Sequence, residues 1–241
     1  MEMQSLHGQN LKKIFLNNPM LSIIIVESSL ELIPKQLLNH PSITSYSRNF
    51  KKNPSKILLD NSWHFAAMKG LENEIKRGRP DILHLTLLSI CTTPAFFKNK
   101  LKVYIHTVNN HIITINNNAR LPKSYHRFQG LIEKLFVTKK IESEDEILLE
   151  LKNYTLEQLI TKINPTEIIG LTTKGKKTTF DELIKHIPEN TCILIGGFQK
   201  GHFNNATQKL LKKSFSINDQ SLEAHLVASR LVYEYEKTIF I

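Results

Sequence analysis

The part of the sequence best suited to holding a small molecule is residues 191–201, where an apolar run leads into three glycines. Residues 193–195 show no alternation with polar residues, which is the pattern of a strand covered on both faces. Gly196, Gly197 and Gly201 follow, and glycine lets a backbone turn sharply and approach a ligand closely. The segment predicts a small-molecule pocket at the end of a buried strand, with an ordinary glycine-rich turn as the alternative.

A dinucleotide site is a poor fit to these glycines. Its fingerprint has a strand, a glycine turn and a helix, then an acidic residue about 20 positions on at the end of a second strand. Here Glu223 stands instead at the start of a predicted final helix. The glycines alone leave the identity of the ligand open.

A second set of residues could bind a polyanion. The chain has 32 Lys plus Arg against 22 Asp plus Glu, a formal net charge of +10, which favours a partner such as a nucleic acid. The basic residues gather in 48–56, 69–79 and 120–140, whereas residues 142–150 form an acidic block. This uneven distribution predicts a basic binding face, and a merely solvated surface is the alternative.

The elements that would position these residues alternate between strands and helices, which is typical of an α/β fold. Strands are predicted at 21–27, 56–59, 101–107, 112–115, 167–171, 191–195 and 212–217. Helices are predicted at 31–38, 61–73, 80–90, 125–136, 155–163, 179–187 and 222–237, and residues 42–56 are expected to form a long loop. In open parallel sheets, ligands bind at the carboxyl ends of the strands.

Length and composition are those of a folded globular protein. At 241 residues and 41% hydrophobic, the chain can bury one large core or two small ones. No apolar run is long enough for a membrane span and residues 1–19 are polar, so a cytoplasmic protein is expected, or a nucleolar one if the source is eukaryotic. Cys91 and Cys192 lie in apolar segments without zinc-site spacing, so neither a metal site nor a disulfide is expected.

Several segments together resemble one known family. They are Leu-Leu-Asp at 58–60, Arg-Pro-Asp-Ile at 79–82 with Leu-Leu at 87–88, Val-Tyr-Ile-His-Thr at 103–107, Arg-Leu-Pro at 120–122, Arg-Phe-Gln-Gly-Leu at 127–131 and Ile-Gly-Gly-Phe at 195–198. In this order and spacing the chain resembles, over roughly residues 21–236, the pseudouridine N1-methyltransferases of ribosome biogenesis. These belong to the knotted SPOUT class, and the archaeal members are the most similar.

The resemblance implies a fold, a cofactor and partners. The fold is a mostly parallel α/β sheet flanked by helices, with a C-terminal trefoil knot and a β-hairpin and helical extension. Residues 1–241 would form one domain, with the core at about 21–238, the RNA-binding extension at about 56–150 and the cofactor-binding knot at 165–241. The implied protein is a homodimer that transfers a methyl group from S-adenosylmethionine to N1 of a pseudouridine in small-subunit ribosomal RNA.

The resemblance also assigns site residues. The cofactor-binding residues it implies are Leu171, Thr172, Ile195, Gly196, Gly197, Phe198, Gly201, Ile217 and Leu222. The RNA-binding residues are Arg77, Arg79, Arg120, Lys123 and Arg127, with the rings of Tyr125 and Phe128 among them. The sequence departs from the family at Lys200, usually histidine, at Ser221, usually proline, at His225, often tryptophan in archaea, and at Lys123, usually arginine.

Asp81 is the catalytic residue that the resemblance implies. It would orient the target base and accept the N1 proton, whereas its place beside Pro80 at a helix start is also explained by the helix dipole. His84 and His106 are expected to be core or strand-face histidines. The rival hypothesis to a methyltransferase is a non-catalytic ribosome-assembly factor that only clamps RNA.

Overall fold

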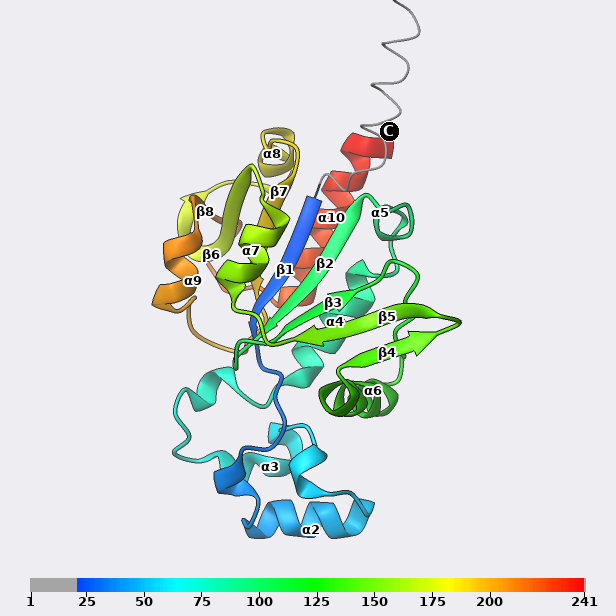
Figure 1. Cartoon of the computed structure of the whole chain (residues 1–241). Coiled ribbons are helices and arrows are strands. Elements are labelled where there is room, and N and C mark those ends of the chain that lie inside the picture. The colour runs from blue at the N-terminus through cyan, green and yellow to red at the C-terminus, as the bar shows by residue number, and fades with distance from the viewer. Residues whose placement is uncertain (1–20, 241) are drawn as a thin grey trace, which may run out of the picture.

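The fold is built on one mixed sheet. The computed structural model describes residues 21–240, so the polar stretch 1–19 lies outside the described residues. Among the described residues, eight strands form a sheet in the order β4-β5-β3-β2-β1-β7-β6-β8 (Figure 1). The strands are β1 (Leu21–Ser28), β2 (Leu101–Thr107), β3 (Ile112–Ile115), β4 (Lys140–Ser143), β5 (Glu146–Lys152), β6 (Glu167–Lys177), β7 (Thr191–Gly196) and β8 (Lys213–Ser216).

The parallel part of the sheet is centred on β1. Ile23 of β1 aligns with Val103 of β2 and with Ile193 of β7, and β6 pairs in parallel with β7 and β8. All eight residues of β1 are buried, which explains its nearly continuous apolar sequence. The predicted mostly parallel sheet flanked by helices is confirmed.

Helices cover both faces of this sheet (Figure 1). The helices are α2 (Pro41–Phe50), α3 (Asn61–Met68), α4 (Pro80–Ile90), α5 (Pro94–Phe97), α6 (Tyr125–Thr138), α7 (Leu156–Ile163), α8 (Phe180–Lys185), α9 (Asn205–Leu210) and α10 (Ala224–Phe240). Of these, α2 and α3 lie apart from the sheet (Figure 1). Ile23 and Ile25 share a core with α4, α6, α8 and α10, whereas Ile24 and Val26 face α7. Successive side chains of β1 therefore point to opposite faces of the sheet, and each face packs against its own layer of helices. No helix of residues 21–240 is long and apolar enough to cross a membrane.

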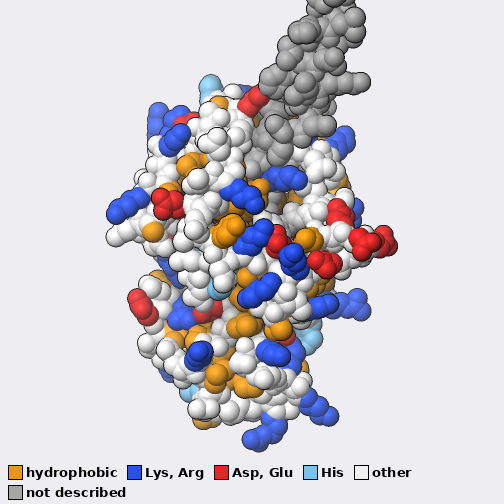
Figure 2. Space-filling model, in the orientation of Figure 1, with side chains coloured by type: hydrophobic (Ala, Val, Ile, Leu, Met, Phe, Trp, Pro, Cys, Tyr) orange, Lys and Arg blue, Asp and Glu red, His pale blue; other side chains and the backbone are white. Residues whose placement is uncertain are grey.

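The antiparallel part of the sheet includes two hairpins. The predicted hairpin of β2 and β3 is confirmed, with Ile105 opposite Ile113. The second, β4 and β5, falls on the acidic block, for which no strand was predicted. In β5, Leu149 and Leu151 are buried while Glu150 is partly exposed, a period-two alternation that the charge run concealed. Acidic side chains project at the edge of the molecule where the turn joins β4 to β5 (Figure 2).

Residues 33–71 form a small helical module, of which the sequence analysis predicted only α3. The expected helix at 31–38 is wrong, because this stretch holds only a bridge from Leu32 to Leu58 and the 3-10 helix Lys35–Leu37. The expected loop at 42–56 contains α2 and the 3-10 helix Pro54–Lys56. Pro41 begins α2 at its first position instead of ending a preceding helix. The strand expected at 56–59 is likewise reduced to that single bridge.

Several element boundaries also differ from the prediction. Helix α3 ends at Met68, before Gly70 with its positive φ of 81°, instead of continuing to residue 73. Strand β6 continues past Leu171 to Lys177 through an irregularity in its pairing with β8. At Gly175 a Cβ would lie 2.5 Å from the backbone of Phe215, so this close approach requires glycine. The short helices α5 and α9 were not predicted.

Candidate functional site

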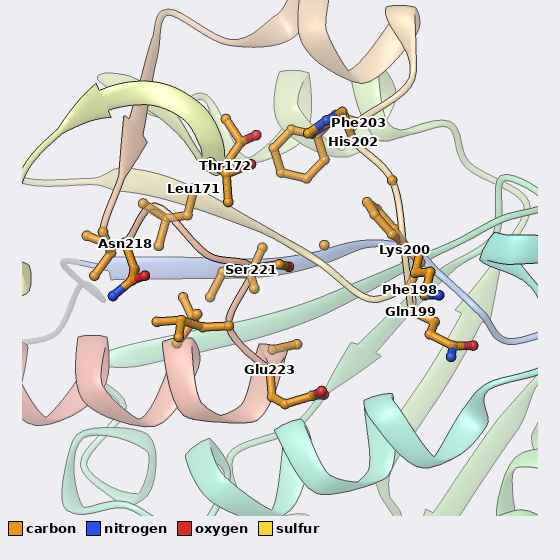
Figure 3. Close-up of a pocket in the computed structure, with 18 of the residues that line it drawn as sticks. Leu171, Thr172, Phe198, Gln199, Lys200, His202, Phe203, Asn218, Ser221 and Glu223 are labelled. Atoms are coloured by element: carbon orange, nitrogen blue, oxygen red, sulfur yellow. The ribbon is translucent and has the colours of Figure 1, made fainter.

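A cavity of about 320 Å³ opens at the carboxyl ends of β6, β7 and β8 (Figure 3). Three segments form its walls: residues 171–173 within β6, where its pairing with β8 becomes irregular, residues 195–203 from the end of β7 onward, and residues 217–224 from the end of β8 to the start of α10. Ile82 of α4 and Val227 of α10 close the apolar side. This is the place where parallel sheets bind ligands, as the sequence predicted for these three loops.

Most of the cofactor residues implied by the resemblance meet in this cavity. Those that line it are Leu171, Thr172, Ile195, Gly196, Phe198, Gly201, Ile217 and Leu222. Lys200 and Ser221, at which the chain departs from the family, line it as well, whereas His225 does not. The sequence analysis missed His202, Phe203 and Glu223, which lie just beyond the predicted segments on the same loops.

Gly197 is a correction to the predicted cofactor site, because it does not line the cavity. A Cβ at this position would lie 2.5 Å from Ser28 Oγ and 2.8 Å from Ile25 Cγ2, on the side of β1. Its N–H donates to the Val26 carbonyl at 2.8 Å, and its carbonyl accepts from the Ser29 N–H at 2.9 Å. Glycine is needed here for close packing of β7 against β1, not for contact with a ligand.

A buried ion pair holds the Phe198 side of the cavity. Lys76 Nζ lies 2.6 Å from Glu27 Oε2, with the side chains 15% and 4% exposed, respectively. The same ammonium donates to the His202 carbonyl and lies 4.2 Å from the centre of the Phe198 ring. The other carboxylate oxygen, Oε1, accepts from the Asn204 N–H at 2.9 Å. We call these contacts the Glu27–Lys76 clamp; they fix residues 198–204 from outside the cavity.

The start of α4 brings Asp81 and Arg79 to the edge of the same cavity. Arg79 Nε and Nη2 donate to the two carboxylate oxygens of Asp81 at 2.8 and 2.7 Å. This bidentate pair raises the pKa of Arg79, to which the nearby charge of Glu223 also contributes. Ile82, the next residue, lines the cavity. Asp81 is thus held in a fixed orientation beside the cavity and remains 39% exposed.

Arg77 is engaged within the protein. Its Nε and Nη2 donate to Glu31 Oε1 and Oε2, each at 2.6 Å, and these hydrogen bonds raise its pKa. Asn109 Nδ2 donates to the same carboxylate at 3.1 Å. This geometry disfavours the RNA contact predicted for Arg77 and indicates that it ties the segment before α4 to the residues after β1.

Three of the other expected RNA-binding residues are exposed. Lys123 and Arg127 are exposed and form no ion pair within residues 21–240. The Arg120 guanidinium, also exposed, lies 4.5 Å from the centre of the Phe97 ring. These three cations and Arg79 flank the start of α4 and the start of α6 in the chain, and they remain candidates for binding phosphate.

The histidines and cysteines set aside from the sequence are buried. His84 Nε2 lies 2.8 Å from the Pro122 carbonyl oxygen. Burial lowers the pKa of His106, whose Nδ1 accepts from the Glu27 N–H. Burial also raises the pKa of the Cys91 thiol and that of Cys192, the latter to about 12. Among residues 21–240 no group of three or more His, Cys, Asp and Glu side chains could hold a metal ion.

Comparison with known proteins gives a consistent result. A family model described as EMG1/NEP1 methyltransferase matches residues 23–236. Proteins named ribosomal RNA small subunit methyltransferase Nep1 are similar: that of Staphylothermus marinus is 39% identical over 88% of this chain and 93% of the relative. That of Saccharolobus solfataricus is 42% identical over 88% and 94%.

A solved structure is similar over nearly the same length. The crystal structure of Archaeoglobus fulgidus Nep1 bound to S-adenosylhomocysteine has a TM-score of 0.81 and 37% identity, and the match covers 90% of this chain and 97% of that one. The fold and nearly the whole length of the chain agree with these matches. The chain therefore belongs to the EMG1/NEP1 methyltransferase family.

Proposed function

We propose that this protein is an S-adenosylmethionine-dependent methyltransferase that modifies N1 of a pseudouridine in small-subunit ribosomal RNA during ribosome biogenesis. The observation that carries the proposal is the cavity at the ends of β6, β7 and β8, which is lined by most of the residues that the resemblance assigns to the cofactor. The relatives named above are small-subunit ribosomal RNA methyltransferases, and the solved one is bound to S-adenosylhomocysteine, the product left after methyl transfer.

The cavity suits the proposed cofactor. Its volume of about 320 Å³ lies at the lower end of the range for ligand pockets, roughly 300–1,000 Å³. Leu171, Ile195 and Ile217 supply apolar walls, and Thr172 and Asn218 supply polar groups on the same loops (Figure 3). Apolar walls with a few placed polar groups would hold an adenosine and orient its polar tail.

The residues of this chain would act by positioning and by accepting a proton. S-adenosylmethionine, when bound, supplies an electrophilic methyl group. We assign the exposed cations Arg120, Lys123 and Arg127 to the RNA backbone, and Asp81 to the target base, where its carboxylate orients the ring and accepts the N1 proton. Holding the attacking nitrogen in line contributes most of the rate, about 7–11 kcal/mol at best.

Methyl transfer to a short RNA loop tests the proposed function. The loop carries either uridine or pseudouridine at one position, and incorporation of labelled methyl is measured with the complete protein. Methylation of the pseudouridine RNA alone is expected. Tight RNA binding without methylation, and without cofactor binding in isothermal titration, would overturn the proposal in favour of an RNA-clamping assembly factor.

Arg120→Ala and Arg127→Ala are each expected to weaken RNA binding by about 1–3 kcal/mol, because each removes a charge-assisted contact. Each should also lower the salt slope of the affinity by about 0.7, the value for one phosphate of a single strand. Fluorescence anisotropy at several salt concentrations measures both quantities. Lys209→Ala, an exposed cation on α9, is the matched control and should change neither.

We further propose that residues 165–241 are the knotted cofactor-binding part of a single domain and that residues 56–150 carry the RNA contacts. The cavity loops support the first assignment, and Asp81, Arg120 and Arg127 support the second. A nick introduced between residues 150 and 165 tests it, since the two parts should then divide cofactor and RNA cross-links between them. Cross-linking of both ligands to one part contradicts this division.

We also propose a homodimer, supported by the exposed apolar side chains Leu85 on α4 and Tyr233 on α10, two helices that pack together. A light-scattering mass near 27.8 kDa at micromolar concentration would contradict the dimer.

We also propose a cytoplasmic location, which a substrate in ribosomal RNA supports. Cell fractionation tests this location, because the protein should co-sediment with precursors of the small subunit.

A further inference from the structure

The aromatic rings expected to face RNA are used inside the protein. The Phe128 ring is fully buried and stacks on His84 with 4.5 Å between ring centres. The Tyr125 hydroxyl donates to Asp60, the residue that caps α3. The Phe128 ring cannot stack on a nucleotide without leaving the core, and the Tyr125 ring is tied to α3 through its hydroxyl. Any aromatic rings that stack freely on RNA bases must therefore lie elsewhere on the surface.

Exposed rings do stand nearby, on the helical module. Trp63 of α3 is 52% exposed and Phe50 of α2 is 39% exposed. Phe50 lies 5.9 Å from Trp63 and 6.2 Å from His126, which is exposed on the first turn of α6, as measured between ring centres. We call Phe50, Trp63 and His126 the ring cluster. It is an aromatic surface that no other part of residues 21–240 covers.

The ring cluster is held from beneath. Tyr46 is buried, and its ring centre lies 4.4 Å from that of Phe50 and 5.4 Å from that of Trp63. Asp60 accepts from the Ser62 N–H at 2.9 Å at the start of α3 and also receives the Tyr125 hydroxyl. The rings are thus positioned before any ligand binds, which lowers the entropic cost of binding.

The surroundings of the cluster are basic and lead to the proposed reaction site. Lys51 follows Phe50, Arg127 follows His126, and both are exposed. The Asn61 N–H donates to the Gly78 carbonyl at 2.8 Å, which attaches α3 to the residue before Arg79. Figure 2 shows Lys and Arg side chains among apolar patches over the lower part of the molecule, where Figure 1 places α2 and α3.

We propose that Trp63, flanked by Phe50 and His126, stacks on an unpaired base of the RNA that carries the target nucleotide. The inference rests on the proposed function and extends it, because it makes the helical module part of the RNA interface. Every base has a face that can stack on an indole, and basic side chains beside the rings bind the backbone. The positive charge around the cluster favours RNA over an apolar protein partner.

The chain offers a direct probe, because Trp63 is its single tryptophan. A base stacked on the indole quenches its emission, so titration of the complete protein with the RNA loop should quench emission in parallel with binding measured by anisotropy. Trp63→Ala should weaken RNA binding about 5- to 150-fold, the loss of one stacked base. Its affinity for S-adenosylmethionine should stay unchanged.

Two further variants serve as controls. Trp63→Phe keeps a ring and should retain most of the RNA affinity, which separates stacking from any folding defect of Trp63→Ala. Phe65→Ala removes a ring on the same helix that is 61% exposed but lies outside the ring cluster, and it should bind RNA normally. Circular dichroism melting checks that each variant is folded.

Unchanged emission on RNA binding, together with unchanged affinity in Trp63→Ala, would overturn this inference. Methylation of the RNA loop by the unaltered protein would in that case still support the proposed function. Quenching that appears only when small-subunit ribosomal proteins are added to the RNA would also overturn it, in favour of a protein contact. Loss of affinity equal in Trp63→Ala and Phe65→Ala would mean that the two rings have no distinct roles, which contradicts the inference.

Discussion

Asp81→Asn is expected to lower the single-turnover rate of methyl transfer by roughly 10²- to 10⁴-fold, the range for loss of a general base. Asparagine cannot accept the N1 proton and presents an amide where the base would meet a carboxylate. RNA affinity should hold or rise, because a negative charge leaves a basic surface. Rapid-quench assays with saturating RNA and cofactor measure the rate, and anisotropy measures the affinity.

The paired oxygens of Asp81 give this experiment a second possible outcome. Both accept from Arg79, so the substitution also weakens the bidentate hold on the guanidinium. If RNA affinity falls as much in Asp81→Asn as in Arg79→Ala, Asp81 acts by placing Arg79. Asp181→Asn removes the corresponding first-turn carboxylate of α8 and is the matched control. Full activity in Asp81→Asn would show that Asp81 has no catalytic role and only interacts with the dipole of α4.

Lys76→Met is expected to destabilise the protein by about 3–5 kcal/mol, the effect of removing one partner of a buried ion pair. The Glu27 carboxylate is only 4% exposed, so it would be left with a single backbone donor, the Asn204 N–H. Cofactor affinity should fall as well, because Lys76 also holds the His202 carbonyl on the cavity wall. Urea unfolding measures the stability, and titration calorimetry measures the affinity.

A surface pair provides the control for the clamp. Lys213 lies 2.8 Å from Glu167 with its side chain 53% exposed, and Lys213→Met should cost less than about 1 kcal/mol. Adding Glu27→Gln to Lys76→Met should recover part of the lost stability, because the unpaired charge is then gone. Equal stability of Lys76→Met and Lys213→Met would show that the clamp contributes nothing beyond an exposed pair.

Features encoded over a few neighbouring residues could be predicted from the sequence. The continuous apolar runs of β1 and β7, the alternation in β2 and the proline at the start of α4 each follow from local chemistry. A pocket at the end of β7 could be predicted because its apolar run leads directly into glycines. The resemblance supplied what local patterns lack, namely which loops act together.

Features that depend on distant partners could not be predicted. The direction in which Gly197 faces is set by Ser28 and Ile25 of another strand. Similarly, the sequence alone suggests that Arg77 is an exposed cation, and only the structure shows that Glu31 pairs with it. Helix α2 was missed because Pro41 is equally consistent with the end of one helix and the start of the next.

The central place of β1 in the sheet has a consequence for how the chain folds during synthesis. Leu21, where β1 begins, pairs with Leu101 on one side and with Thr191 on the other. Until β7 has been made, a strand rich in isoleucine has one edge unpaired and one face incompletely covered, which invites pairing with other chains. The growing chain must therefore keep β1 shielded until β7 has been synthesised, and any product that stops before Thr191 carries an aggregation-prone edge at the centre of its sheet.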